Sequence, residues 1–419
     1  MLYFSYNIFL IFLYPFLVFL SIFIKRLKYN FQIRREKIEF KNNQNKIVYW
    51  FHASSVGEYE SIRPLAHAIK QKKSQSLIVF SVFSDSAYTQ RKNDILHDFF
   101  FVLPIDFSWK MKKLIKQINP KIIFYSRYDV WPNMVKIAAS MNITQYLISA
   151  VLPAKSARGK GLTGQLYANI YKYLNNIFSV HKEHTKRFKN LSLNAKTAGD
   201  IRFDSIKMKL KNPPSNFINE GKKIKLLFNH KKAILIGGST YSKSEDFLIE
   251  TIKNNIDMGL ILVPHHINKN HITKIIHTTT KNNLNFILYS NLKNRKVNDN
   301  IDILIVDKLG LLQYLYSLAN FAYVGGGWKG SVHSVIESSY FGLPLITGPY
   351  INNSQEAIDL KKRGCLYVMK SPSYKEISSF YNYSVKNKNK YIKIKDNIKK
   401  YFNSNLNSVD YIIKNISLG

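Results

Sequence analysis

Two carboxylates in the first half of the chain stand where a proton could be transferred. Glu58 ends the segment H-A-S-S-V-G-E at 52–58, and Asp129 lies in R-Y-D-V-W-P-N at 127–133. A carboxylate at a cleft can accept a proton from a sugar hydroxyl. An acidic side chain near a helix start can equally stabilise the helix dipole or act as a cap. The residues alone leave both interpretations open.

Two glycine segments in the second half suit the binding of an anion. The first is G-G-G-W-K-G-S-V-H-S-V-I-E at 325–337, and the second is G-G-S-T at 237–240. Consecutive glycines let backbone N–H groups approach an anion, and a following helix adds its positive dipole end. His333 and Glu337 are four residues apart, so we expect them on one face of that helix, touching phosphate and ribose. A tight strand–helix turn and an ordinary helix cap are the structural alternatives.

Further polar groups follow other apolar runs. Lys155 and Arg158, in K-S-A-R-G at 155–159, suit an anionic substrate, although a solvated loop fits the residues as well. His265 and His266 follow the run 260–263. Adjacent residues on an extended segment point to opposite sides, so we expect anion contact or plain surface there and no metal site.

Strands and helices alternate through the chain. In the first half we expect strands at 46–52, 76–83, 99–104, 121–125 and 143–149, with helices near 56–72 and 109–118. A second series has strands at 233–236, 259–263, 285–289, 303–306, 321–324 and 344–346. This alternation predicts two α/β domains with parallel sheets, and ligands bound at the carboxyl ends of the strands, in the cleft between the domains.

The two ends of the chain have a different character. Residues 2–24 are almost wholly apolar and are followed by Lys25, Arg26 and Lys28, so we expect a retained membrane anchor over 1–28 with the body on the cytoplasmic side. Pro15 allows a kinked, interfacial anchor instead. We then expect domains at 29–204 and 233–390, a connection at 205–232, and a C-terminal helix over 391–419 that crosses back to the first domain.

Composition limits the function classes. The chain has 419 residues, 62 Lys and Arg, 26 Asp and Glu, a formal net charge of +36 and one cysteine. One cysteine excludes a disulfide framework within the chain and a multi-cysteine zinc cluster. A strongly basic chain can bind nucleic acid, an anionic membrane or an anionic substrate. The basic residues are scattered through both domains, which speaks against a nucleic-acid-binding protein.

Taken in order, these segments resemble the 3-deoxy-D-manno-octulosonic acid (Kdo) transferases of lipopolysaccharide synthesis. The resemblance also includes G-D-I-R-F-D at 199–204, V-P-H-H at 263–266, F-G-L-P-L-I-T-G-P at 341–349 and N-S-Q-E-A at 353–357. It implies a GT-B glycosyltransferase with two Rossmann-like domains facing a cleft. The first domain would bind a lipid A precursor and the second CMP-Kdo, at the inner membrane, with inversion and without a metal or other cofactor.

The resemblance also implies roles for single residues. Glu58 would be the general base, and Asp129 stands where the family commonly has a second functional Glu. The substrate-binding positions would be Ser55, Gly57, Lys155, Arg158, Ser239, Thr240, His265, Gly325, Gly326, Gly327, Gly330, His333, Glu337, Asn353 and Glu356.

Two positions depart from the family pattern. The family often reads E-T-E-x-W-P-N where this chain has R-Y-D-V-W-P-N, a version that resembles the Bacteroidetes-type branch. Many members have Pro-Arg-His where this chain has Pro264-His265-His266, so either another residue or a protonated His265 would supply the missing charge. The alternatives are another membrane-associated GT-B enzyme that uses a different nucleotide sugar, and a noncatalytic relative, which the presence of Glu58 and of the glycine–His–Glu segment disfavours.

Overall fold

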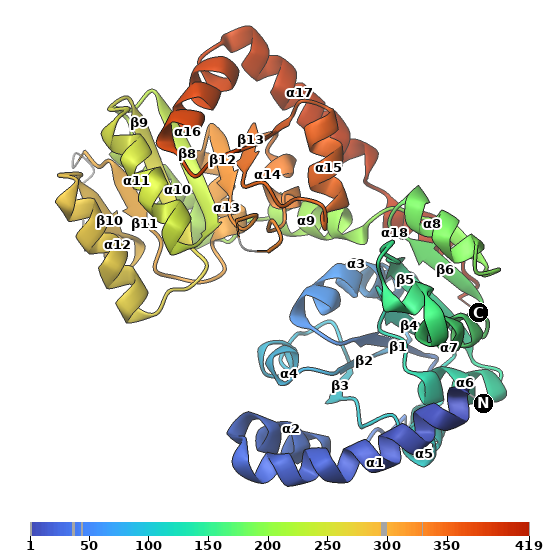
Figure 1. Cartoon of the computed structure of the whole chain (residues 1–419). Helices are drawn as coiled ribbons and strands as arrows, with labels where there is room; N and C mark the ends of the chain where they lie inside the picture. Colours follow the sequence, from blue (N-terminus) through green and yellow to red (C-terminus); the bar gives the residue numbers. More distant parts are fainter. Residues whose placement is uncertain (1, 36–37, 43–44, 295–299, 329, 419) are drawn as a thin grey trace. The chain divides into compact units, whose positions relative to one another are not determined.

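The computed structural model describes residues 2–35, 38–42, 45–294, 300–328 and 330–418. The chain divides into two compact units (Figure 1): unit 1 is Met1–Ser205 with Asn405–Gly419, and unit 2 is Ile206–Ser404. Each unit contains a seven-stranded parallel sheet covered by helices. The predicted α/β class is therefore confirmed.

The sheet of unit 1 has the order β3-β2-β1-β4-β5-β6-β7. The first five strands lie where the sequence predicts them, whereas β6 and β7 were not predicted. The strands are β1 Val48–Ala53, β2 Leu77–Val82, β3 Phe99–Val102, β4 Ile122–Ser126, β5 Thr144–Ala150, β6 Asn176–Ser179 and β7 Ala195–Thr197.

Helices on both faces of this sheet explain its nearly continuous apolar strands. All six residues of β1 are buried. Val48 and Trp50 belong to one hydrophobic cluster, and Tyr49, Phe51 and Ala53 belong to another. Successive side chains of a strand point to opposite faces, so both faces of β1 must be apolar. The helices of unit 1 are α1 Leu2–Phe23, α2 Lys25–Arg35, α3 Val56–Lys72, α4 Asp85–Arg91, α5 Ser108–Ile118, α6 Pro132–Ser140, the 3-10 turn η1 Ala157–Gly159, α7 Gly161–Tyr171, α8 Lys182–Lys189, the start of α9 Ile201–Lys211, and α18 Ser408–Lys414.

Unit 2 repeats the architecture with the strand order β10-β11-β9-β8-β12-β13-β14. Its strands are β8 Ala233–Thr240, β9 Met258–Pro264, β10 Phe286–Leu288, β11 Ile303–Ile305, β12 Phe321–Val324, β13 Leu345–Thr347 and β14 Leu366–Val368. Its longer helices are α10 Ser215–Leu227, α11 Ser242–Lys253, α12 Lys269–Lys281, α15 Gln355–Lys362, α16 Tyr374–Phe380 and α17 Lys388–Ser404, with the short α13 Leu312–Leu315 and α14 Ile336–Tyr340.

Several local expectations differ from the structure. Strand β8 continues through Gly237-Gly238-Ser239-Thr240, where the sequence predicted a strand–helix turn. Helix α14 begins only at Ile336, so His333 precedes the helix and does not share a helical face with Glu337. The expected C-terminal helix is two helices, because Asn407 takes a left-handed conformation between them, with φ 70°. The predicted connection at 205–232 contains most of α9 and all of α10.

Helix α1 lies along unit 1 and is tied to it by one polar face. The hydroxyl of Tyr6 donates to Asp106 (2.9 Å), and that of Tyr3 donates to Asn133. The Asn133 amide in turn donates to Asn7 (2.9 Å). Residues 3, 6 and 7 are spaced as neighbours on one helical face. The opposite face exposes Phe4, Phe9, Ile11, Phe12, Phe16, Phe19, Ile22 and Phe23.

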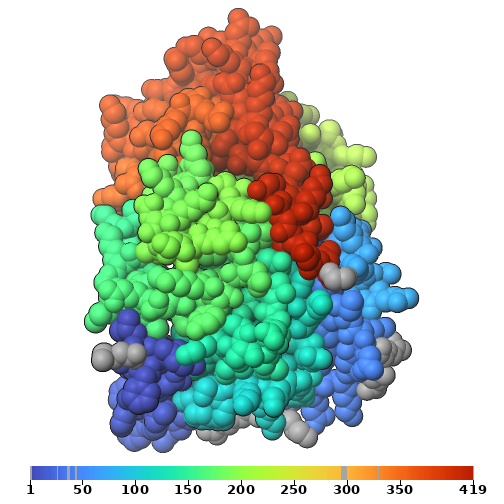
Figure 2. All heavy atoms as spheres, turned by 90° about the vertical axis from the view of Figure 1, so that its right-hand side faces the viewer, coloured from blue at the N-terminus to red at the C-terminus, as the bar shows by residue number. Residues whose placement is uncertain are grey.

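By length and composition, α1 is the one helix in the described part of the chain that could cross a membrane. It remains one helix through Pro15. In the space-filling view the dark-blue start of the chain lies at the surface (Figure 2). An exposed apolar face of this size on a soluble domain marks an interaction surface.

Candidate active site

The two carboxylates singled out in the sequence meet at the carboxyl ends of β1 and β4. The backbone N–H of Ser54 donates to Glu58 Oε2 (3.0 Å) and to Asp129 Oδ2 (2.9 Å). Glu58 also closes a capping box at the start of α3, since its carboxylate accepts from the N–H of Ser55 (3.0 Å). Glu58 therefore has the structural role that the sequence left open, and it also faces a second acid.

This second acid changes the protonation of Glu58. Burial, followed by the hydrogen bond and the charge of Asp129, raises the pKa of Glu58 to about 8, against the opposing effects of Arg127 and Ser55. Two carboxyl groups that share one donor cannot both ionise freely, so the pair holds a proton near neutral pH. A carboxyl group with a pKa near the working pH suits general acid–base chemistry.

A neutral histidine fixes the segment that carries Asp129. Trp131 Nε1 donates to His52 Nε2 (2.9 Å), so the ring proton of His52 is on Nδ1, which lies 2.8 Å from Ser81 Oγ. Burial lowers the pKa of His52 to about 4. His52 is thus an uncharged link between β1 and the W-P-N segment, a role that the sequence analysis did not assign.

Unusual backbone conformations and unpaired polar atoms occur in the segments that follow β1, β4 and β5. Arg127 and Ser149, near the ends of β4 and β5, have φ angles of 59° and 51°, which non-glycine residues rarely adopt. The buried side-chain atoms without a hydrogen-bond partner in the described part of the chain include Ser54 Oγ, Ser149 Oγ and Arg158 Nε. Buried polar atoms are normally paired, so orphans beside an acid pair indicate a site that a ligand completes.

The other sequence-predicted residues of unit 1 lie nearby or at its edge. Ser55 is the N-cap of α3, and Gly57 is exposed in its first turn, where an added Cβ would meet nothing within 4 Å. The guanidinium of Arg158 lies over the rings of Tyr167 (4.9 Å) and of Tyr128 (4.8 Å), the residue that precedes Asp129 in sequence. Lys155 is exposed in the preceding loop and is not drawn into this group.

In unit 2, Ser239 and Thr240 shape the end of β8. Ser239 has a φ of 53°, and the pairing of β8 with β9 is irregular between Gly238 and Thr240. Thr240 is buried, and its hydroxyl donates to Glu245 (3.0 Å), whose carboxylate also contacts His271 Nε2 (3.0 Å). The Thr240 hydroxyl is therefore engaged inside the unit.

A cluster of imidazoles and one phenol lies at the ends of β8 and β9. The rings of His265 and His333 stack with centroids 4.8 Å apart, and Tyr241 lies 5.0 Å from His265. His333 Nε2 is 3.2 Å from the Tyr241 hydroxyl, and His266 packs edge-on against His265. Burial lowers the pKa of His265, with a further contribution from His266, and burial with the influence of His265 lowers that of His333.

Close backbone packing explains most of the glycine segment. A Cβ on Gly325 would lie 1.9 Å from the carbonyl oxygen of Ser239. Gly326 and Gly327 have φ angles of 83° and 74°, and Gly330, with φ 114°, has open space around its Cβ position. Gly325 is therefore needed where the loop packs on β8, Gly326 and Gly327 are needed for their positive φ angles, and Gly330 alone of the four has open space at its Cβ position.

The last three predicted residues lie on two flanking elements. Glu337 is half-buried in α14, and Asn353 is exposed before α15. Glu356, in the first turn of α15, accepts from the Ser354 hydroxyl (2.8 Å). The loop that leads to Asn353 is paired with the glycine segment, since the N–H of Tyr350 donates to Gly327 (3.0 Å).

A pocket of about 550 Å³ opens beside this cluster. It is lined by Tyr241, Lys243, His266, His271, Gly326 and Trp328, with Ser242 and Ser244. Sequence reasoning singled out none of Tyr241, His271 and Trp328 individually. The position of Tyr241, directly after the G-G-S-T segment at a strand end, is the signal that could have indicated it.

Solved structures similar to this chain share its fold. A UDP-GlcNAc 2-epimerase from Neisseria meningitidis matches with a TM-score of 0.63 at 12% identity, covering 88% of this chain and 100% of that one. The complex of Alr3699/HepE from Anabaena with UDP matches with a TM-score of 0.58 at 12% identity, covering 88% of this chain and 98% of that one. At such low identity these matches show the α/β fold of the GT-B type and nothing further.

The curated proteins that are similar to this chain include several glycosyltransferases. A bifunctional glycosyltransferase/methyltransferase from Fusobacterium nucleatum is 24% identical over 81% of this chain, which spans only 52% of that longer protein. Kdo transferases from Chlamydophila psittaci and Rickettsia bellii are each 25% identical, over 74% and 83% of this chain and 71% and 83% of their own lengths.

The N-terminal part of the chain also matches a protein family. Residues 26–205 match the family described as 3-deoxy-D-manno-octulosonic-acid transferase (kdotransferase). This region contains both carboxylates, His52 and the segment around Arg158. In this region, and over most of its length by comparison with single proteins, the chain is therefore similar to the 3-deoxy-D-manno-octulosonic acid transferases.

Proposed function

We propose that this protein is an inverting glycosyltransferase that transfers Kdo from CMP-Kdo to a lipid A precursor, lipid IVA, with Glu58 as the general base. The observation that carries the proposal is the Glu58–Asp129 pair, bridged by the backbone N–H of Ser54, whose buried Oγ has no hydrogen-bond partner. The similarity to Kdo transferases supports Kdo as the sugar that is transferred.

The proposed reaction uses the unit 1 carboxylates for proton transfer. Ionised Glu58 takes the proton of the acceptor hydroxyl as its oxygen bonds to the anomeric carbon of Kdo. The bond from that carbon to the CMP phosphate breaks, and CMP leaves with the negative charge. Because Asp129 raises the pKa of Glu58, it makes Glu58 a stronger base once the pair has lost its proton.

The imidazole cluster of unit 2 is our candidate site for the CMP phosphate. Its rings are adjacent, and burial lowers their pKa values. A phosphate bound beside them would raise these pKa values, because its negative charge stabilises the protonated imidazoles. The proposal requires no metal ion, and we expect EDTA to leave the rate unchanged. Membrane association would come from the exposed apolar face of α1, with the basic residues of α2 on the cytoplasmic side.

The test is a transfer reaction analysed by mass spectrometry. Purified protein is incubated with CMP-Kdo and a tetraacylated lipid A precursor, with EDTA present, beside a known Kdo transferase as the positive control. We expect the lipid to gain the mass of one or more Kdo units. No gain by a folded protein, while the control enzyme is active, would refute this donor–acceptor pair. Competition by CMP and by UDP would then test the alternative donor.

A further inference from the structure

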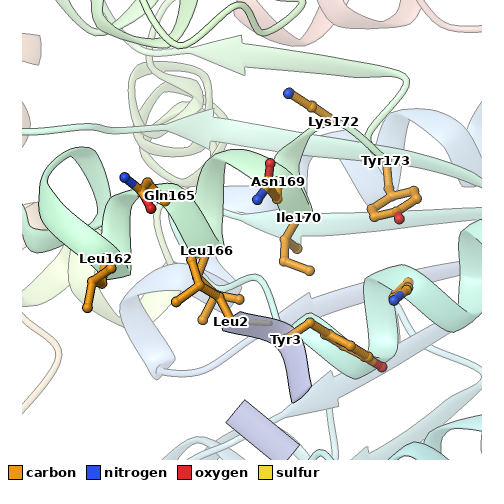
Figure 3. A pocket seen from close by; sticks show the side chains of 10 residues that line it. Leu2, Tyr3, Leu162, Gln165, Leu166, Asn169, Ile170, Lys172 and Tyr173 are labelled. Atoms are coloured by element: carbon orange, nitrogen blue, oxygen red, sulfur yellow. The ribbon is translucent and has the colours of Figure 1, made fainter. Parts of the chain in front are cut away.

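A pocket of about 780 Å³ lies in unit 1 between the start of α1 and helix α7 (Figure 3). Its apolar lining comes from Leu2 of α1 and from Leu162, Leu166 and Ile170 of α7. In the close view Leu166 and Ile170 point from α7 toward Leu2 and Tyr3. The volume falls within the roughly 300–1,000 Å³ typical of small-molecule sites.

Two lysines belong to the lining of this apolar pocket. Lys172 is exposed just after α7, and the ammonium of Lys136, on α6, lies 3.8 Å from the centroid of the Tyr3 ring. An apolar pocket lined in part by ammonium groups is complementary to a molecule with a hydrocarbon part and a phosphate part.

The pocket continues the apolar surface of α1. Leu162 is 70% exposed and Phe4, next to Tyr3 on α1, is 69% exposed. Because α1 is held against unit 1 through Tyr3, Tyr6 and Asn7, the exposed Phe and Ile residues stay beside the pocket. If the exposed apolar face of α1 contacts a bilayer, the pocket lies beside the bilayer surface. A lipid that leaves the bilayer can then enter the pocket directly.

The same helix connects the pocket with the carboxylate pair. The turn η1 comes immediately before α7, and an added Cβ on Gly164 would lie 2.9 Å from the backbone of Gly159, so turn and helix are closely packed. Arg158 of this turn contacts Tyr128, the neighbour of Asp129, and Tyr167, between the pocket residues of α7. Pocket and carboxylates therefore keep a fixed relation within unit 1.

We infer that this pocket binds an acyl chain of the glycolipid acceptor, while Lys136 and Lys172 hold an acceptor phosphate. The inference rests on the proposed function for the identity of the acceptor. It assigns α7 a positioning role. Helix α7 would fix the lipid end of the substrate, and the turn η1 directly before it lies beside the segment that carries Asp129.

Leu162→Asp tests the inference, because this exposed side chain contributes little to the core. The matched control is Ile95→Asp, at a position 98% exposed and outside the pocket lining. Transfer is measured with the acylated precursor and with its deacylated, water-soluble disaccharide bisphosphate. We expect Leu162→Asp to raise the KM for the acylated acceptor about tenfold, leaving kcat and the deacylated reaction unchanged. Equal effects on both acceptors, or no effect on either, would overturn the inference.

A second measurement does not depend on transfer. A lipid A precursor with a photoreactive diazirine at the end of one acyl chain is crosslinked to the protein, and the labelled peptide is identified. We expect labelling within 161–173 in the wild type and its loss in Leu162→Asp, but not in Ile95→Asp. Labelling without any transfer would refute the proposed function and keep the pocket, whereas transfer with labelling elsewhere would refute the pocket alone.

Discussion

The strand ends of the two units carry opposite chemistry on sheets of the same kind. In unit 1 the ends of β1 and β4 bring together Glu58 and Asp129, and burial with the neighbouring acid raises the pKa of Glu58. In unit 2 the ends of β8 and β9 gather His265, His333 and Tyr241, and burial lowers the pKa of both imidazoles.

This difference shows how two units with the same architecture can carry different chemical groups. Each sheet only brings a set of loops to its carboxyl edge, and the residue types in those loops decide what the edge can do. Unit 1 can hold and release a proton, whereas unit 2 offers groups that gain charge when an anion arrives. This division of proton transfer and anion binding between the units predicts that substitutions in unit 1 change the chemical step. Substitutions in unit 2 should instead change donor binding.

The largest effect is expected for Glu58→Gln. The amide keeps an oxygen that can accept from Ser54 and Ser55 but cannot take a proton. We expect kcat to fall about 10²–10⁴-fold. Donor affinity, measured by calorimetry with CMP, should not change. The control is Glu183→Gln, on helix α8. A drop in donor affinity that matches the loss of rate would contradict the division between the units.

A smaller effect is expected for His265→Ala, and it depends on pH. The ring faces His333, Tyr241 and His266, with Lys243 and the Glu245–His271 pair on the neighbouring helices. Protonated imidazoles attract the donor phosphate, and they lose their protons as pH rises. The affinity for the donor should therefore weaken from pH 6 to pH 8.

We expect the alanine variant to raise the donor Kd about tenfold at pH 6 and clearly less at pH 8. His265→Arg should bind the donor with a weaker dependence on pH, because guanidinium stays charged. His277→Ala, exposed on α12, is the control. The same loss at both pH values would show that the ring acts by shape and not by charge.

The smallest effect on the fold is expected for Gly57→Ala. The added methyl group meets no atom within 4 Å, and alanine is favoured over glycine in a helix by about 1 kcal/mol, so unfolding should occur at an equal or higher temperature. If the acceptor approaches the start of α3, the methyl group should raise the acceptor KM a few-fold. Unchanged acceptor kinetics would place the acceptor elsewhere along unit 1.

Much of the fold follows from the sequence because the strands are apolar and β-branched or aromatic. The strand β1 is recognised as a short continuous apolar run, and the amphipathic α5 is recognised from its helical periodicity. The strands β6, β7 and β14 were not predicted, although strands of the same length, such as β3 and β11, were. The extension of β8 through Gly237 and Gly238 depends on pairing with β9 and β12, which are distant in sequence.

The carboxylate pair shows where sequence reasoning stops. The positions of Glu58 and Asp129 after two strands predict that they meet at one sheet edge. Their shared donor, the backbone N–H of Ser54, is a property of the turn and is not visible in the residue types. The link from His52 to Trp131 likewise needs two segments 79 residues apart to be placed side by side. The four-residue spacing of His333 and Glu337 misled the prediction, because α14 begins only after the glycine loop has closed on β8.

The most direct test is the pH dependence of kcat/KM for the acceptor, at saturating CMP-Kdo, in the wild type and in Asp129→Asn. A general base must be ionised, so the wild-type value should rise with pH and level off above an apparent pKa of about 8, which belongs to the coupled pair. Removing the charge of Asp129 should move this rise to lower pH by one unit or more, with a lower plateau. An unchanged profile in the variant, or a flat profile in the wild type, would contradict a proton-transferring pair in unit 1.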